Sequence, residues 1–266
     1  MCSTYSLFYL DNSRYDPQTK PERSVLRLEA GSWNKYSFTV PTDFPDRGYT
    51  FTTLEKELIY VVGGEKDEGP GTIDVLSVFK SVDGKKWDKK LNFELKKGRA
   101  NPYACITKND QTLRNNLVVF GGVGSSDKEL EIYDLEESRL ARVNSGLTGL
   151  PFNHLNPSNK LVCHDGWMHV IDDSLTVSVV LSYKLSNAAY KQHTLAPIKG
   201  ATKDYSGGQL IVYENKVGIV GGLDHNGNNL KEIYNFDAAK GVWSVGAEFP
   251  WSEEYYKGRF VPVVHE

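Results

Sequence analysis

The chain has 266 residues, of which 39% are hydrophobic and 24% are charged, and it carries a formal net charge of -3. This composition excludes a disordered chain, because it supplies enough apolar surface to bury a substantial core. The pI near 6.1 excludes a general nucleic-acid binder, which needs a basic excess or stripe, so we expect no nucleic-acid partner.

The N-terminal residues, MCSTYSLFYLDNSRYD, show neither a basic segment nor a long apolar stretch, and nowhere do about 18 apolar residues follow one another. We therefore expect no leader segment in this chain and no membrane partner. The three cysteines, Cys2, Cys105 and Cys163, are too few and odd in number for a disulfide framework. We interpret Cys105 and Cys163 as small core residues and expect a cytoplasmic protein in a reducing compartment.

In chain order, the first predicted strands cover residues 5–12, residues 24–30, and Trp33 together with residues 36–40. They are typical of the second, third and fourth strands of a four-stranded sheet whose first strand is missing. Residues 258–266, at the other end, are typical of a first strand without successors. Pairing of these segments would place both chain ends in one sheet and remove unpaired sheet edges.

Between the two ends, short β-rich runs that end in a residue pair recur along the chain. They are LIYVVGG (58–64), LVVFGG (117–122), MHVIDD (168–173) and VGIVGG (217–222). From Gly63 the steps to Gly121, Asp172 and Gly221 are 58, 51 and 49 residues. This recurrence of roughly 50 residues predicts a repeat architecture.

A second strand follows each run after a polar loop, and its aromatic residue precedes an apolar or aromatic residue at a repeating distance. The spacing is seven residues for Tyr133 and Leu140, Tyr183 and Tyr190, and Phe236 and Trp243, and eight for Phe79 and Trp87. A glycine doublet permits close backbone approach and unusual dihedral angles, so we interpret the doublets as structural. A phosphate-binding GxxxxGK[ST] motif does not occur in the sequence.

These motifs resemble the Kelch repeat, in which a glycine doublet is followed by a tyrosine and then by a tryptophan. The resemblance covers nearly the whole chain, although Asp172-Asp173 replaces one doublet. It implies an all-β protein, with residues 1–266 forming a single β-propeller domain of Kelch-like blades. We expect five blades, closed by pairing of the N- and C-terminal strands in one blade. Six blades would require a repeat that the sequence does not contain.

In propellers of this kind, the segments that join the blades share a face with the loops after the doublets, and that face often carries the partner site. Each joining segment here has a basic residue or a histidine close to an aromatic residue. The candidate ligand-binding residues are Arg47 with Tyr49, Arg99 with Tyr103, His154 with Phe152, Lys203 with Tyr205, and Arg259 with Phe260.

A ring of such residues would bind a small anionic molecule or an acidic protein segment, because guanidinium groups grip carboxylates and aromatic rings add apolar contact. The alternative is that each arginine orders its own turn and each aromatic side chain packs between blades. Asp46, Glu253 and Glu254 lie in the same segments and could pair with the arginines.

The loops after the doublets carry carboxylates and a histidine, which are the groups of general acid-base catalysis and of hard-metal sites. They are Glu65, Asp67, Glu68, Asp127, Asp172, Asp173, Asp224 and His225. Their spacing matches no motif, so we assign no catalytic residue, no metal ligand and no cofactor. Cys163, His164 and His169 occupy a predicted hairpin, where alternation sends side chains to opposite faces and argues against zinc.

Three functions remain open. The first is a binding module that recognises a protein segment or a small anionic ligand through loops at one face of the propeller. The second is an enzyme of isomerase or lyase type that acts on a small metabolite in the central pocket, as some Kelch-like propellers do. The third is a carbohydrate-binding lectin, suggested by Trp251, Tyr255 and Tyr256.

Overall fold

The computed structural model describes residues 7–10, 23–29, 32–38, 44–46, 48–54, 58–68, 71–74, 77–81, 88–100, 102–109, 111–122, 129–144, 161–172, 179–187, 189–194, 209–213, 216–220, 231–237, 240, 242–248 and 259–262. All regular structure in these residues is β-strand. None of them belongs to a helix long and apolar enough to cross a membrane.

The described strands form five four-stranded antiparallel sheets and one two-stranded sheet. The terminal sheet contains, in spatial order, β22 (Arg259–Pro262), β1 (Leu7–Leu10), β2 (Arg23–Glu29) and β3 (Ser32–Phe38). The predicted pairing of the chain ends is confirmed, because Leu7 lies opposite Pro262 and Leu10 lies opposite Arg259.

We name the other four sheets after their first strands. The β4 sheet contains β4 (Thr50–Leu54), β5 (Leu58–Val62), β8 (Ser77–Ser81) and β9 (Asp88–Glu94). The β10 sheet contains β10 (Tyr103–Lys108), β11 (Asn115–Phe120), β12 (Leu130–Asp134) and β13 (Arg139–Asn144). The β14 sheet contains β14 (Leu161–His164), β15 (Trp167–Asp172), β16 (Val179–Lys184) and β17 (Tyr190–Thr194). The β18 sheet contains β18 (Gln209–Tyr213), β19 (Lys216–Val220), β20 (Glu232–Asp237) and β21 (Val242–Glu248).

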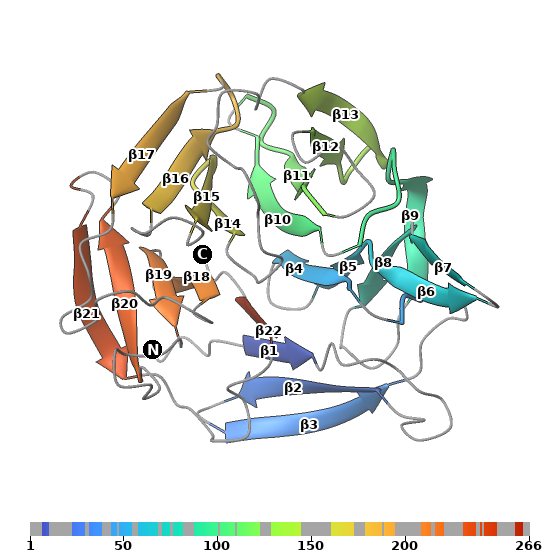
Figure 1. The fold of residues 1–266 in the computed structure, drawn as a ribbon, viewed down its shortest axis with the longest axis horizontal. Helices are drawn as coiled ribbons and strands as arrows, with labels where there is room; N and C mark the ends of the chain where they lie inside the picture. The colour runs from blue at the N-terminus through green and yellow to red at the C-terminus, as the bar shows by residue number, and fades with distance from the viewer. Residues whose placement is uncertain are drawn as a thin grey trace.

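The sheets are arranged around a common centre, and their first strands lie nearest to it (Figure 1). These first strands contact one another in the order β4, β10, β14, β18, β22 and then β4 again. Each run that carries or replaces a doublet supplies the second strand of its sheet, as the repeat predicts. The run that ends in Asp172-Asp173 is no exception, since its strand β15 pairs with both β14 and β16.

The repeating seven-residue distance corresponds to one cross-strand contact in three sheets. Tyr133 lies opposite Leu140, Tyr183 opposite Tyr190, and Phe236 opposite Trp243, each pair joining the third strand to the fourth. In the β4 sheet Phe79 lies opposite Lys89, and Trp87 is outside the described residues. The spacing is therefore set by the length of the hairpin between the outer strands.

The first two glycine doublets are structural, as predicted, and Gly221-Gly222 lies outside the described residues. Gly63 and Gly122 have φ angles of 64° and 91°, in the left-handed region that side chains disfavour. A Cβ atom on Gly63 would lie 2.5 Å from the carbonyl oxygen of Arg99, and one on Gly122 would lie 2.7 Å from that of Ala100. These two doublets thus let the segment that joins the β4 and β10 sheets pack directly on the ends of β5 and β11.

Strands β11 and β12 of the β10 sheet are buried on both faces, which explains why apolar residues predominate in them. One face packs against the β4 sheet through residues such as Leu117, Val119 and Tyr133. The other packs against the β14 sheet through residues that include Val118 and Met168.

Cys105 and Cys163 join these last two sheets in a disulfide, with an S–S distance of 2.06 Å and Cα atoms 5.5 Å apart. Both residues are buried, at 5% and 4% exposure, as predicted. The expectation that they are unbonded is wrong, because β10 and β14 are adjacent first strands and bring the two sulfur atoms together.

Candidate functional site

The predicted ring of ligand-binding residues is only partly described by the structure. Tyr49, Arg99 and Tyr103 are buried, with exposed fractions of 0%, 0% and 4%. Arg259 and Phe260 lie in β22, although their side chains are not among the described ones. The remaining candidates lie outside the described residues, namely Arg47, Phe152, His154, Lys203 and Tyr205.

The two described aromatic candidates pack inside the protein. The ring of Tyr49 lies 5.7 Å from that of Phe44 in an edge-to-face contact, and the ring of Tyr103 lies 6.4 Å from that of Phe120. Such contacts stabilise the core and leave no ring surface for a ligand. For Tyr49 and Tyr103, packing between sheets replaces the predicted ligand contact.

Arg99 orders the segment that joins the β4 and β10 sheets. Its Nη2 atom lies 2.5 Å from Oε1 of Glu131, and its Nη1 atom donates a 2.8 Å hydrogen bond to the carbonyl oxygen of Gly121. The second carboxylate oxygen of Glu131 accepts a hydrogen bond from the hydroxyl of Tyr133, which itself accepts one from the Lys96 amide. Arg99 is therefore a structural residue, and its proposed contact with a ligand is corrected, because the buried carboxylate requires its charge.

This network makes the phenol of Tyr133 hard to ionise. Burial, the hydrogen bond to Glu131 and the nearby carboxylate charge all raise the pKa of Tyr133 above its ordinary value. The folded protein therefore keeps Tyr133 neutral at pH values at which the unfolded chain ionises it.

We expect the neutral Tyr133 phenol to contribute fully to the free energy of unfolding below pH 10, the ordinary pKa of tyrosine. This contribution should be lost as the pH rises above 10. Above pH 10, the free energy of unfolding of the wild type should fall with each pH unit by about 1.4 kcal/mol more than that of Tyr133→Phe, which has no phenol to ionise at this position. Urea unfolding from about pH 8 to about pH 11 measures this difference. If the free energy of unfolding of the two proteins changed equally with pH, ionisation of Tyr133 would not be coupled to folding.

The carboxylates after the first doublet are in a hairpin instead of the predicted loop. Glu65 and Asp67 belong to β6 (Glu65–Glu68), which pairs with β7 (Gly71–Asp74). The carbonyl of Glu65 accepts a 2.7 Å hydrogen bond from the amide of Asp46, whose carboxylate accepts one of 2.9 Å from the amide of Asp67. Asp46, which sequence analysis offered as an arginine partner, thus holds this hairpin.

The rest of the predicted acidic set is not gathered within the described residues. Asp172 ends β15 opposite Val179, while Asp127, Asp173, Asp224 and His225 lie outside the described part of the chain. Nowhere among the described residues do three or more His, Cys, Asp or Glu side chains form a group suited to a metal ion.

The predicted hairpin of Cys163, His164 and His169 is confirmed, with Asp165 and Gly166 at its turn. The alternation along β14 and β15 places Cys163 on one face and the two histidines on the other. Cys163 is disulfide-bonded, and Nδ1 of the buried His169 lies 2.8 Å from the Ser182 hydroxyl. These contacts assign structural roles to Cys163 and His169.

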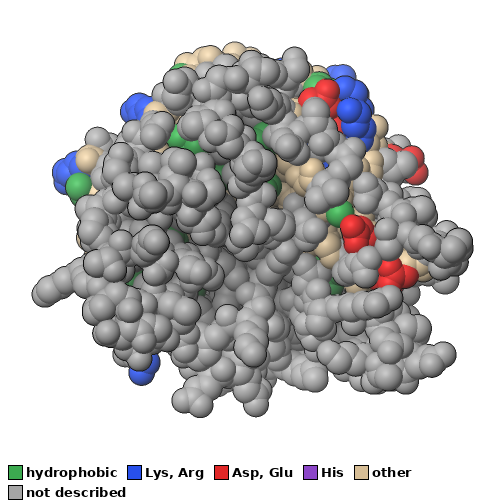
Figure 2. Space-filling model, in the orientation of Figure 1, with side chains coloured by type: hydrophobic (Ala, Val, Ile, Leu, Met, Phe, Trp, Pro, Cys, Tyr) green, Lys and Arg blue, Asp and Glu red, His purple; other side chains and the backbone are tan. Residues whose placement is uncertain are grey.

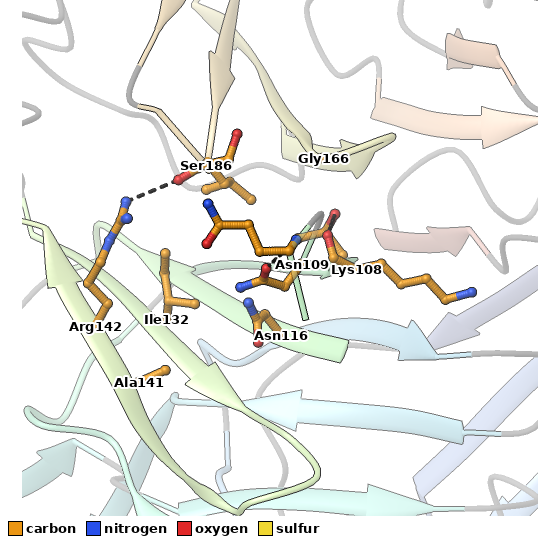
Figure 3. Close-up of a pocket in the computed structure, with 11 residues that line it drawn as sticks. Lys108, Asn109, Asn116, Ile132, Ala141, Arg142, Gly166 and Ser186 are labelled. Carbon is orange, nitrogen blue, oxygen red and sulfur yellow. Dashed lines mark hydrogen bonds between the residues drawn. The ribbon is translucent and has the colours of Figure 1, made fainter. Parts of the chain in front are cut away.

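A cavity of about 220 Å³ lies between the β10 and β14 sheets (Figure 3). It is at the hairpin ends of β10 and β11, which are the ends opposite to the doublet Gly121-Gly122. Most of the residues that line it are polar, and none of them is a carboxylate: Thr107, Lys108, Asn109, Gln111, Asn116, Ile132, Ala141, Arg142, Gly166, Leu185 and Ser186.

The predicted site lay among the loops on the doublet side, so the prediction did not include this cavity. The sequences of β10 and β11 do contain a signal for the cavity. Tyr103 and Cys105 are followed by Thr107 on one face of β10, and Phe120 and Val118 are preceded by Asn116 on the same face. Two polar residues that interrupt an apolar face at neighbouring positions mark the place where the sheets separate.

Beside the cavity, Arg114, Asp134, Glu137 and Arg139 form pairs of opposite charge. Acidic and basic side chains lie together at the upper right of Figure 2, over the region where Figure 1 draws β12 and β13. Arg114 lies 3.2 Å from Asp134 and also pairs with Glu137, which pairs in turn with Arg139. Burial raises the pKa of Asp134, but hydrogen bonds from the Glu137 amide and from Arg114 outweigh it and lower that pKa overall.

Comparisons with known proteins bear on the fold. No family model and no curated protein matches the chain. One solved structure, described as a novel fungal alcohol oxidase of the AA5 family in complex with copper, matches with 13% identity and a TM-score of 0.52. The match covers 91% of this chain and 62% of the oxidase chain, so this chain spans less than two thirds of that protein.

A second solved structure, described as that of YjhT, matches with 14% identity and a TM-score of 0.53. It covers 86% of this chain and 78% of the YjhT chain. Both neighbours contain β-propellers, and both matches support an all-β fold of antiparallel sheets for this chain.

Proposed function

We propose that residues 1–266 form one closed, Kelch-like β-propeller with five blades. The cyclic contacts between the first strands support this proposal, as does the terminal sheet built from both ends of the chain. Full closure removes exposed sheet edges, which otherwise invite aggregation.

On this scaffold we propose an enzyme that acts on a small hydroxylated metabolite at the centre of the doublet face. The observation that carries this proposal is the likeness, over 91% of the chain, to a structure described as an alcohol oxidase. The Kelch resemblance adds isomerisation and bond cleavage as reaction classes. Asp224 and His225, which follow the third glycine doublet, are the acid-base pair that we propose to test.

The test is to incubate the full chain with simple alcohols, aldoses and aldonic acids, and to follow isomerisation and cleavage by proton NMR. Hydrogen peroxide release, with and without added copper, reports oxidation. We expect turnover that Asp224→Asn lowers by about 100-fold or more, the usual contribution of a general acid or base. The control Asp237→Asn changes a carboxylate that pairs with Lys240 at the end of β20, and should keep full activity.

Absence of turnover in every arm would overturn the enzyme proposal. Equal activity of Asp224→Asn and wild type would overturn the role of Asp224. If no arm shows turnover, the second candidate, a module that binds a small anionic molecule, takes the place of the enzyme. The cavity between the β10 and β14 sheets favours that candidate over recognition of a protein segment, because its volume of about 220 Å³ suits a small molecule and its lining has no carboxylate.

A further inference from the structure

The cavity between the β10 and β14 sheets has one cation that is available to a ligand. Arg142 reaches it from β13, where a register shift beside Ile132 interrupts the pairing with β12. Its Nη2 atom donates a 3.1 Å hydrogen bond to the carbonyl oxygen of Leu185, which leaves its other N–H groups for further acceptors. Among the described residues no carboxylate pairs with Arg142, whereas Arg114 and Arg139 both have carboxylate partners.

Amide groups face this guanidinium across the cavity (Figure 3). Asn109 accepts hydrogen bonds from the amides of Gln111 and Thr112, at 2.8 and 3.1 Å, so its side-chain oxygen is occupied. Asn116 is only 8% exposed, lies opposite Thr107 and borders the cavity. The side-chain amide of Asn116 borders the cavity, where a ligand can replace water as its hydrogen-bond partner.

The walls of the cavity are fixed before any ligand arrives. Asp165 and Gly166, with φ angles of 52° and 72°, form a tight turn whose Gly166 carbonyl accepts a 3.2 Å hydrogen bond from the Leu185 amide. The Cys105–Cys163 disulfide holds β10 against β14 two residues from Thr107. Preformed walls lower the ordering cost of binding.

We propose that this cavity binds a small monoanionic hydroxycarboxylate, with its carboxylate on Arg142 and its hydroxyl groups on Asn116, Asn109 and Thr107. The volume of about 220 Å³ is below the range for drug-sized ligands and suits a molecule of a few carbon atoms. The Lys108 side chain extends away from the other labelled residues in Figure 3, so a single guanidinium supplies the positive charge. One cation matches a monoanion better than a phosphate dianion.

The experiment titrates glycerate, its neutral analogue glycerol and inorganic phosphate into the full-length protein by calorimetry. We expect saturable binding of glycerate, no detectable binding of glycerol, and weaker binding of phosphate. Arg142→Gln should weaken glycerate binding by about tenfold or more, as loss of a charge-assisted hydrogen bond does. Arg139→Gln, on the same strand but outside the lining, should bind glycerate within about twofold of wild type.

Three results would overturn the proposal: no saturation by glycerate, equal affinity of Arg142→Gln and wild type, or an equal loss in Arg139→Gln. Phosphate binding as tight as that of glycerate would overturn the assignment to a carboxylate. Arg142 is exposed, so Arg142→Gln should fold, and its thermal unfolding checks this. Binding at this cavity does not depend on turnover at the doublet face, so each proposal can fail alone.

Discussion

Reduction of the Cys105–Cys163 disulfide is expected to lower the free energy of unfolding by about 4 kcal/mol. The bond closes a loop between residues that are 58 apart in sequence, and loss of such a constraint frees the unfolded chain. The bond also joins two sheets whose buried side chains pack against each other in this part of the core. Few single changes in this protein should cost as much.

Guanidinium-induced unfolding with and without a thiol reductant measures this effect. Cys105→Ala/Cys163→Ala should unfold at the midpoint of the reduced wild type and should not respond to the reductant. Cys2→Ala serves as a control that keeps the bond and should respond as the wild type does. An unchanged wild-type midpoint on reduction would contradict the prediction, as would a mass spectrum with three free thiols.

Arg99→Met is expected to destabilise the protein by about 3–5 kcal/mol, because it leaves the carboxylate of Glu131 buried without a cation. Both side chains of this ion pair are 0% exposed, so water cannot replace the missing partner. The Tyr133 hydroxyl would remain as a donor to Glu131, but one neutral hydrogen bond does not offset a buried charge.

A double-mutant cycle with Arg99→Met and Glu131→Leu measures the interaction energy between the two side chains. Each single variant should lose several kcal/mol, whereas the double variant should lose much less than the sum, because no charge is then left unpaired. Urea unfolding of the four proteins gives the coupling energy, with exposed Arg139→Gln as a control that costs about 0.5 kcal/mol or less. Additive losses would show that the two side chains do not interact.

The architecture was largely predictable because each repeat carries its own local signals. The doublets mark the ends of the second strands, and the distance from Tyr133 to Leu140 reports a hairpin whose length is constant between sheets. The match between residues 7–10 and 259–262 could be inferred because an incomplete sheet at one end required a strand from the other.

The site was harder to predict, because a residue type does not state its environment. Arg99 beside an aromatic residue in a joining segment has the same pattern whether it faces a ligand or a buried carboxylate. Only the register, which places Glu131 against the end of that segment, distinguishes the two cases. The disulfide was missed for a related reason: Cys105 and Cys163 occupy equivalent strands, but sulfur contact depends on how closely those strands approach.

The shared terminal sheet has a consequence for the order in which the protein folds in the cell. Leu10 emerges from the ribosome early, but its partner Arg259 follows only after about 250 further residues. At about 5–20 residues per second, β1 waits roughly 12–50 s for β22. During that interval the edge of β1 that β22 later covers is unpaired, and until β22 is made that edge can pair with another chain.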